Sequence, residues 1–485
     1  MNTRRVRILD PNGDPFPRHR RPIAATYDNA ATTVDNTRHW ANSDRLSAAS
    51  ANSLAVRKKL RERARYEISN NSYARGITLT LANDTIGTGP RLQLGFEDPD
   101  ANRRIEAAWE QWSRASNLAC KLHTLKLAKT CDGEGFAIVG TNPAIRSRVK
   151  LDLGLVECDR VTDDFMFAMS APNREDGIDY DADGNAATFH VLKSHPGDST
   201  FSIMFDSEQI SADDMIHLFR MDRPGQRRGI PEITPALGLF AELRRFCEAT
   251  IAAAETAADF AGAMETDTAM IDPDDSDVEE AIETGDAFEL ERRMFLTLPR
   301  GAKLHQVKAE HPATTYDMFV AAVLREIARC LNMPYNVAAG DSSGYNYASG
   351  RLDHQTYFLS ILIERFIFET QALDRILSAW WREAILVSDL IPPAFRNVGF
   401  DLPHQWRWDG RPHVDPVKEA VARKTLLEQN ATTLARLYAE DGLDWETEIR
   451  QRAKEVNLCK ALGLTIKQAA PKPQPAGPPN QEKPQ

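Results

Sequence analysis

One short segment has residue types that could support covalent catalysis. Residues 340–344 read Gly-Asp-Ser-Ser-Gly, in which a serine hydroxyl could act as a nucleophile. Such a serine needs a histidine base and an orienting carboxylate close to it. No further hallmark of a serine protease accompanies the segment, and its flanks have a helical pattern. We therefore interpret Ser342 and Ser343 as part of a flexible, hydroxyl-rich surface, with a serine hydrolase as an alternative.

Other motifs of catalysis and cofactor binding are absent from the sequence. There is no G-x-x-x-x-G-K-[ST] loop, no G-x-G-x-x-G after a strand and no H-E-x-x-H, and the eleven histidines are dispersed. The six cysteines have no C-x-x-C spacing, which favours reduced thiols over a zinc site or a disulfide framework. We interpret Asp132-Gly-Glu-Gly135 and Asp181-Ala-Asp-Gly-Asn185 as turns. The sequence thus predicts no cofactor, no metal and no enzymatic activity.

Four arginines surround a Pro-Gly-Gln turn at residues 224–226. A cluster of guanidinium groups could hold phosphate, or could pair with carboxylates of a neighbouring subunit. We favour the subunit contact and assign it to Arg223, Arg227 and Arg228.

The net charge of −11 is unevenly distributed along the chain. Residues 264–290 hold eleven acidic residues and no lysine or arginine, whereas residues 1–75 hold fifteen basic and seven acidic residues. A tight DNA binder needs a concentrated basic surface, so we expect at most transient contact with DNA.

Periodicity and composition predict the elements that hold these residues. An arm at the N-terminus precedes helices over about 53–82 and 101–130, a short strand at 91–94 and mixed β structure over 131–220. An alanine-rich helix over 236–264 would permit close approach between subunits. Further helices are expected over 315–331, 351–387 and 414–464, with short strands at 294–298 and 304–307. No apolar run is long enough for a membrane span, and the N-terminus does not resemble a secretory signal, so we expect folding in a cytoplasm.

Several of these features, in this order, resemble lambda-type portal proteins of tailed phages. Each matching motif is weak alone, but together they extend over about residues 55–460. They include Asn70-Asn71, Ile86-Gly-Thr-Gly89, Trp109 with Trp112, Asp132-Gly-Glu134, Ile216-His-Leu-Phe219 with Arg223-Pro-Gly-Gln-Arg-Arg-Gly-Ile-Pro231, and Asn346-Tyr-Ala-Ser349 with Arg351. The chain departs from the family at Ala348-Ser349-Gly350, where two serines are more usual.

The resemblance implies an α+β portal fold assembled as a ring, with a mixed α/β wing, long stem helices, a small α/β clip and a helical crown. The implied parts are an arm (1–54), a wing (55–230), stem helix 1 (231–263), a clip (264–309), stem helix 2 (310–337), a tunnel loop (338–350), a long helix with a return to the wing (351–409), a crown (410–468) and a disordered proline-rich tail (469–485).

The implied function is a channel for packaging and ejection of double-stranded DNA at one capsid vertex. The implied partners are copies of the chain in a ring of about twelve, the terminase large subunit, a head–tail adaptor, and the major capsid and scaffolding proteins. DNA would pass the tunnel loop at Ser342, Ser343, Tyr345, Asn346, Tyr347 and Ser349. Adaptor and terminase would dock on the clip at Asp272, Asp274, Asp275, Asp277, Glu279 and Glu280. Another ring protein of the head–tail junction is the alternative.

Overall fold

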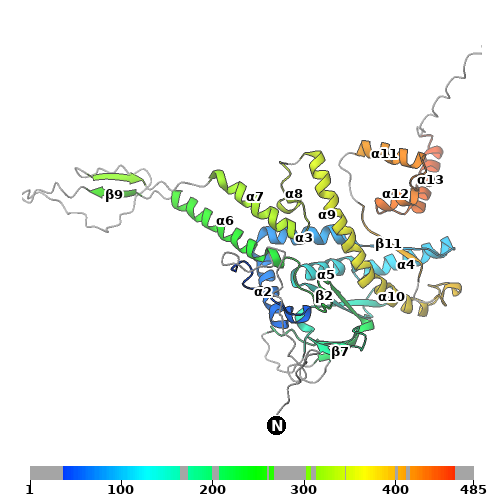
Figure 1. Cartoon of the computed structure of the whole chain (residues 1–485). Helices are drawn as coiled ribbons and strands as arrows, with labels where there is room; N and C mark the ends of the chain where they lie inside the picture. The colour runs from blue at the N-terminus through cyan, green and yellow to red at the C-terminus, as the bar shows by residue number, and fades with distance from the viewer. Residues whose placement is uncertain are drawn as a thin grey trace, which may run out of the picture. The chain divides into compact units, whose positions relative to one another are not determined.

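Figure 1 shows a computed structural model of the chain, coloured from the N-terminus to the C-terminus. The structure describes residues 37–163, 173–198, 207–258, 262–266, 302–306, 313–344, 346–398, 402–410 and 416–464. By internal contacts the chain divides into Met1–Ala51, which contains the helix α1 (Ala48–Ala51), and Asn52–Gln485. Among the described residues, no helix is both long and apolar enough to cross a membrane.

Four helices open the second unit. They are α2 (Leu54–Asn70), α3 (Ser72–Ile86), α4 (Pro99–Ala115) and α5 (Leu118–Asp132). The helix expected over 53–82 is therefore divided in two. Asn71 separates α2 from α3 because its extended backbone ends the first helix, while its side chain accepts hydrogen bonds from the N–H groups of Tyr73 and Ala74. Asp98 and Pro99 start α4 in the same manner, with a side-chain cap followed by proline in the first turn.

Two antiparallel sheets follow these helices. The first has the strand order β3-β2-β8, and the second has the order β4-β5-β6-β7. Their strands are β2 (Glu134–Thr141), β3 (Leu151–Val156), β4 (Arg174–Glu175), β5 (Ile178–Tyr180), β6 (Ala186–Leu192), β7 (Ser207–Ser211) and β8 (Met215–Phe219), with single 3-10 turns at Cys158–Arg160 and Ala212–Asp214. The turn expected at residues 181–185 is confirmed, since the Asp181 carboxylate accepts from the N–H groups of Asp183 and Asn185.

Tryptophans dominate the largest core cluster. Trp109 and Trp112 of α4 pack against Trp380, with ring centroids 4.8 Å apart within the first pair and 5.5 Å apart between Trp109 and Trp380. The indole N–H of Trp112 donates to the carbonyl of Leu151 at 2.8 Å, so the largest apolar side chains also fix β3. A second cluster unites α2 and α3 with segments 233–243, 320–338 and 357–361, and a third lies between the two sheets.

Two long helices flank the acidic region in sequence. The helices are α6 (Leu237–Ala258), which a 3-10 turn at Thr234–Ala236 precedes, and α7 (Ala313–Cys330). They run side by side (Figure 1), with the rings of Phe246 and Tyr316 stacked 5.6 Å apart. The helix expected to reach Met264 ends earlier, because residues 262–266 form a strand. This strand, β9 (Gly262–Thr266), pairs antiparallel with β10 (Ala302–Gln306), which confirms the strand expected near residue 304.

The expected helix over 351–387 has an interruption. After α8 (Tyr335–Ala339), α9 (Tyr347–Phe368) continues through a π-helical turn (Glu369–Leu373) into α10 (Asp374–Leu386). Helix α9 starts before the predicted residue 351, so the last part of the expected loop is helical.

The chain then returns to the strand expected at residues 91–94. After a 3-10 turn at Pro393–Phe395, β11 (His404–Arg407) pairs with β1 (Arg91–Leu94), and α11 (Pro416–Glu428), α12 (Leu434–Glu440) and α13 (Trp445–Ala461) follow. The predicted strand at 294–298, the proline-rich tail and residues 164–172 and 199–206 of the predicted mixed β region lie outside the described residues.

Candidate functional site

The loop after α8 is exposed in its described residues. Gly340 ends α8 in a left-handed conformation at φ +68°, which a residue with a Cβ adopts only with strain. The Asp341 carboxylate accepts from the Ser343 N–H at 2.9 Å, and this hydrogen bond lowers the pKa of Asp341. Ser342 and Ser343 are exposed. The loop therefore presents small polar groups to solvent rather than enclosing them.

No histidine base is placed beside these serines among the described residues. His354, the nearest histidine along the chain, instead contacts the Asn336 amide at 3.2 Å. In the part of the chain that the structure describes, no group of three His, Cys, Asp or Glu side chains could hold a metal ion. The geometry gives no support to the serine hydrolase alternative.

Helix α9, which follows the loop, is anchored to the end of α3. The Arg365 guanidinium donates to the carbonyls of Thr85 at 2.9 Å and Asp84 at 3.0 Å, which are among the unpaired carbonyls at the end of α3. Two helical turns earlier on α9, the Tyr357 hydroxyl donates to the Asp84 carboxylate at 2.6 Å. These contacts fix α9 to α3 from Tyr357 onward.

A buried group of four charges connects α9 to two other parts of the chain. We call Lys126, Lys129, Glu232 and Glu364 the charge quartet. Each lysine of α5 contacts both carboxylates, at N–O distances between 2.7 and 3.1 Å. Glu232 lies just before α6, and Glu364 lies on α9.

The quartet has two positive and two negative charges. Their mutual attraction offsets the free-energy cost of removing each charge from water. Burial alone would raise the pKa of Glu232, but the ammonium groups of Lys126 and Lys129 outweigh it and hold that pKa well below its usual range. In the same way, Glu232 and Glu364 overcome the desolvation of Lys126 and raise its pKa. Glu232 and Lys126 thus stay ionised, and the ion pairs tie the start of α6 to α5 and to the helix that follows the loop.

A second buried network surrounds Glu134 at the start of β2. Glu134 is fully buried, and its carboxylate accepts from the Arg228 guanidinium at 2.7 Å and contacts the His217 ring at 3.1 Å. Desolvation would raise the pKa of Glu134, but Arg228 and His217 lower it well below its usual range. Gly133, at φ +90°, turns the chain from α5 into β2, so the turn predicted at Asp132-Gly-Glu-Gly135 is confined to Gly133, and Glu134 and Gly135 are strand residues.

The sequence itself decides the family. The model of the lambda family of phage portal proteins matches residues 35–362, more than half of the chain. The chain belongs to this family.

Individual relatives agree with the match. A probable portal protein of Halomonas phage phiHAP-1 is 27% identical over 433 residues, which cover 84% of this chain and 81% of the relative. Portal protein B of Escherichia phage lambda is 22% identical over 34% of this chain and 32% of its own length. Among solved structures, a chain from the neck of an empty gene transfer agent particle aligns with a TM-score of 0.46 at 15% identity, over 78% of this chain and 91% of that one.

The arginine cluster separates into different environments. Arg228 is 1% exposed and is bound to Glu134 of its own chain, so the subunit contact predicted for it is wrong. Arg227 lies over the Tyr180 ring, 4.1 Å from its centroid, and is 37% exposed. Arg223 is exposed. The subunit contacts expected for Arg223 and Arg227 stay predictions.

The remaining site predictions fall largely outside the described residues. Tyr345 lies there, and so do all the acidic residues expected to dock partners: Asp272, Asp274, Asp275, Asp277, Glu279 and Glu280. Tyr347 and Ser349 lie in the first turn of α9 rather than in the loop, and Asn346 is exposed just before it.

The charge quartet and the Glu134 network are not among the sequence predictions. Their members are 83 or more residues apart along the chain wherever they join different segments, as with Glu134 and His217 or Lys129 and Glu364. The local signal for the quartet was a lysine pair, Lys126 and Lys129, that lies about one turn apart on α5.

Proposed function

We propose that this family member is the subunit of a ring at one capsid vertex, through which double-stranded DNA enters and leaves the particle. Family membership over residues 35–362 carries the proposal. The order of elements supports it: α6 and α7 flank the acidic insertion, and a polar loop precedes α9. The role is structural, with about twelve copies in the ring and no cofactor.

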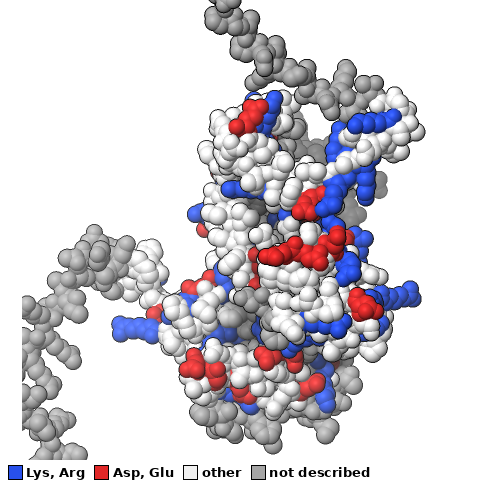
Figure 2. All heavy atoms as spheres, turned by 90° about the vertical axis from the view of Figure 1, so that its right-hand side faces the viewer, with Lys and Arg blue, Asp and Glu red and all other residues white. Residues whose placement is uncertain are grey.

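We assign contact with moving DNA to the loop at Ser342, Ser343, Tyr345, Asn346, Tyr347 and Ser349. In its described part the loop has small or hydroxyl-bearing side chains that are exposed, with Asp341 as its charged residue. Such groups form weak, exchangeable hydrogen bonds with DNA and lack the strong phosphate pairing that would arrest a duplex. Figure 2 shows acidic and basic side chains interspersed on the face that it views, rather than a continuous basic surface.

Substitution in the loop tests this assignment. Ser343→Lys with Asn346→Lys would repeat two positive charges around the ring and should slow or stall packaging while the ring still assembles. Ser343→Gln with Asn346→Gln is the matched control of similar length without charge. Rings of the double-lysine variant that package DNA at the normal rate would show that the loop does not meet the DNA.

Terminase and adaptor would dock on the acidic segment at residues 264–290, which begins in β9. Its eleven carboxylates within residues 264–290 would repel one another around a ring unless they were solvated or faced basic partners. Replacing Asp272, Asp274, Asp275 and Asp277 with serine should weaken adaptor binding and leave the ring intact. Unchanged adaptor affinity, measured by biolayer interferometry on assembled rings, would remove the docking role.

Electron microscopy of the purified chain tests the ring itself. Rings with a central channel, formed without nucleotide or metal, are the expected result, and they would also separate a portal from a monomeric hydrolase. A monomer across wide ranges of protein and salt concentration would contradict the proposal. Ring formation alone does not distinguish a portal protein from another ring protein of the head–tail junction. Stalled packaging by the double-lysine loop variant does make this distinction.

A further inference from the structure

Helix α9 is apolar on the side that faces away from its own core. Tyr357, Ile361 and Phe368 are buried on one side of the helix. The opposite side carries a row of large apolar side chains, each more than half exposed, which we call the α9 row: Leu352, Leu359, Leu362, Ile363 and Phe366. The row recurs at steps of seven and of three or four residues, so it forms one continuous stripe.

An exposed stripe of this size is unusual on an isolated protein. A helix that is apolar on all sides is normally buried on all sides. Five such side chains offer on the order of 500 Å², compared with roughly 800 Å² per partner in a stable interface. The row therefore fits the centre of a protein interface, and its lack of cations argues against DNA as its occupant.

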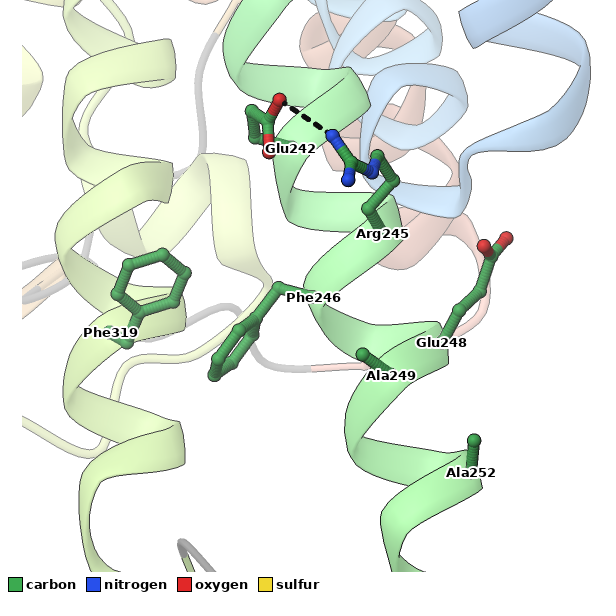
Figure 3. A pocket seen from close by; sticks show the side chains of 7 residues that line it. All are labelled: Glu242, Arg245, Phe246, Glu248, Ala249, Ala252 and Phe319. Carbon is green, nitrogen blue, oxygen red and sulfur yellow. Dashed lines mark hydrogen bonds and ion pairs between the residues drawn. The ribbon is translucent and has the colours of Figure 1, made fainter.

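A groove on the same chain has a complementary character. It lies along α6 and α7, has a volume of about 580 Å³, and is lined by Glu242, Arg245, Phe246, Glu248, Ala249, Ala252 and Phe319. Figure 3 shows Phe246 and Phe319 turned toward the space between the two helices, with Ala249 and Ala252 on the following turns of α6. The small alanines leave room for apolar side chains from outside.

Charges at the edge of the groove can set the direction of binding. Glu248 is 66% exposed at the rim, where it also lies 3.8 Å from the Arg244 guanidinium of its own chain, and the α9 row begins next to the exposed Arg351. Opposite charges across an interface fix its register more than they add to its affinity.

We propose that the α9 row of one subunit occupies the α6–α7 groove of the next copy in the ring. A head-to-tail ring needs two different, complementary surfaces on each subunit, and this chain has one of each. Buried residues of α6, α7 and α9 share one core cluster, so the row and the groove are carried by one packed unit of each subunit. The inference rests on the ring of the proposed function and names the surfaces that hold it.

Substitutions on the exposed row test the interface without disturbing the core. Leu359→Glu and Phe366→Glu should each reduce the fraction of assembled rings at least about tenfold in sedimentation velocity, with the far-ultraviolet circular dichroism of a folded chain. Leu386→Glu, at a side chain that is 83% exposed on α10, is the matched control and should assemble normally. Normal assembly of both row variants would overturn the proposal.

Photo-crosslinking identifies the occupant of the groove. A benzoylphenylalanine at position 362 is irradiated in rings of mixed heavy-isotope and ordinary subunits, so mass spectrometry can distinguish crosslinks between copies. Crosslinks from one copy to residues 242–252 or 316–323 of another are expected. If rings form but the crosslinks reach other segments of a neighbour, reach DNA or do not form, this interface is wrong and the proposed ring is unaffected. If the wild-type chain does not form rings, both the interface and the proposed ring are wrong.

Discussion

Glu134 is a carboxylate without solvent contact, and its ionised state depends on the guanidinium beside it. Arg228 donates to it and also to the carbonyls of Val161 and Asp176, so one side chain joins β2 to two loops. Removing one partner of a buried ion pair leaves the other charge uncompensated, and this cost is larger than the net value of the pair.

Arg228→Met should therefore destabilise the chain strongly. We expect a loss of about 3–5 kcal/mol in the free energy of unfolding, measured by urea denaturation. Arg227→Met is the matched control, because that arginine is more than a third exposed and its pair with Glu175 should contribute less than about 1 kcal/mol. Equal losses for the two variants would mean that Arg228 contributes only as a surface charge does.

The buried carboxylates also predict how stability depends on pH. Glu134 and Glu232 have pKa values held well below 4.5 in the folded chain, so the unfolded chain binds more protons as the solution is acidified. Their contribution is present above the unfolded pKa and is lost as the pH falls through and below about 4.5. Urea midpoints should thus decline steeply from about pH 5 to about pH 3. A flat profile there would contradict ionised Glu134 and Glu232.

At the scale of single residues, the sequence predicted turns but did not predict ion pairs between distant residues. Asp181 and Gly133 stand in local patterns whose backbone requirements are readable from neighbouring residues. Arg228 looked like its exposed neighbours Arg223 and Arg227, because nothing local reveals a carboxylate 94 residues away.

Among the elements, α5 and α9 are joined by the charge quartet. Glu364→Gln leaves two buried ammonium groups facing one carboxylate, so we expect a loss of about 3–5 kcal/mol. Adding Lys129→Met should restore a balance of one cation to one anion and recover much of the loss. A double-mutant cycle measured by urea denaturation checks this, and additive effects of the two substitutions would show that the pair is not coupled.

Helices and strands followed the sequence patterns where the apolar spacing was regular. The strand at 91–94 and the helix over 315–331 are confirmed, with shifts at their ends, whereas the helix over 101–130 is divided at Ser116 and Asn117. The division at Asn71 was missed because alanine and arginine continue the helical pattern on both sides of a residue whose side chain caps the second helix. The π-helical turn has no signal in spacing, since its extra residue is indistinguishable from an ordinary apolar position.

In the whole molecule, the C-terminal helices contribute little to the core. No described residue of α13 is buried, and Leu437 is the one buried side chain of α12. A chain that ends at Asp444 should therefore keep the melting temperature of the remainder within about 2 °C in differential scanning calorimetry. A chain that ends at Phe368 is the contrasting control, because it loses Trp380 and Trp381 from the largest core and should not fold. A large shift for the first truncation would show that α13 stabilises the remainder.

The family was recognisable from motifs that occur in a fixed order along the chain. The tertiary packing between the segments that carry these motifs was not predictable from the sequence. Motifs such as residues 216–231 place strands and turns in order along the chain. The core that unites Trp109 with Trp380, however, depends on contacts between segments that only folding brings together.

The π-helical turn at Glu369–Leu373 fixes the length of the chain between two cores. Tyr357 and Ile361 on α9 enter the second core cluster, whereas Trp380 and Trp381 on α10 enter the first. Each residue of an α-helix advances the side-chain direction by about 100°. Deleting one residue from the turn would leave a regular helix but rotate both tryptophans away from their core. An alignment of relatives should accordingly place its insertions and deletions on either side of residues 357–381, and not within them.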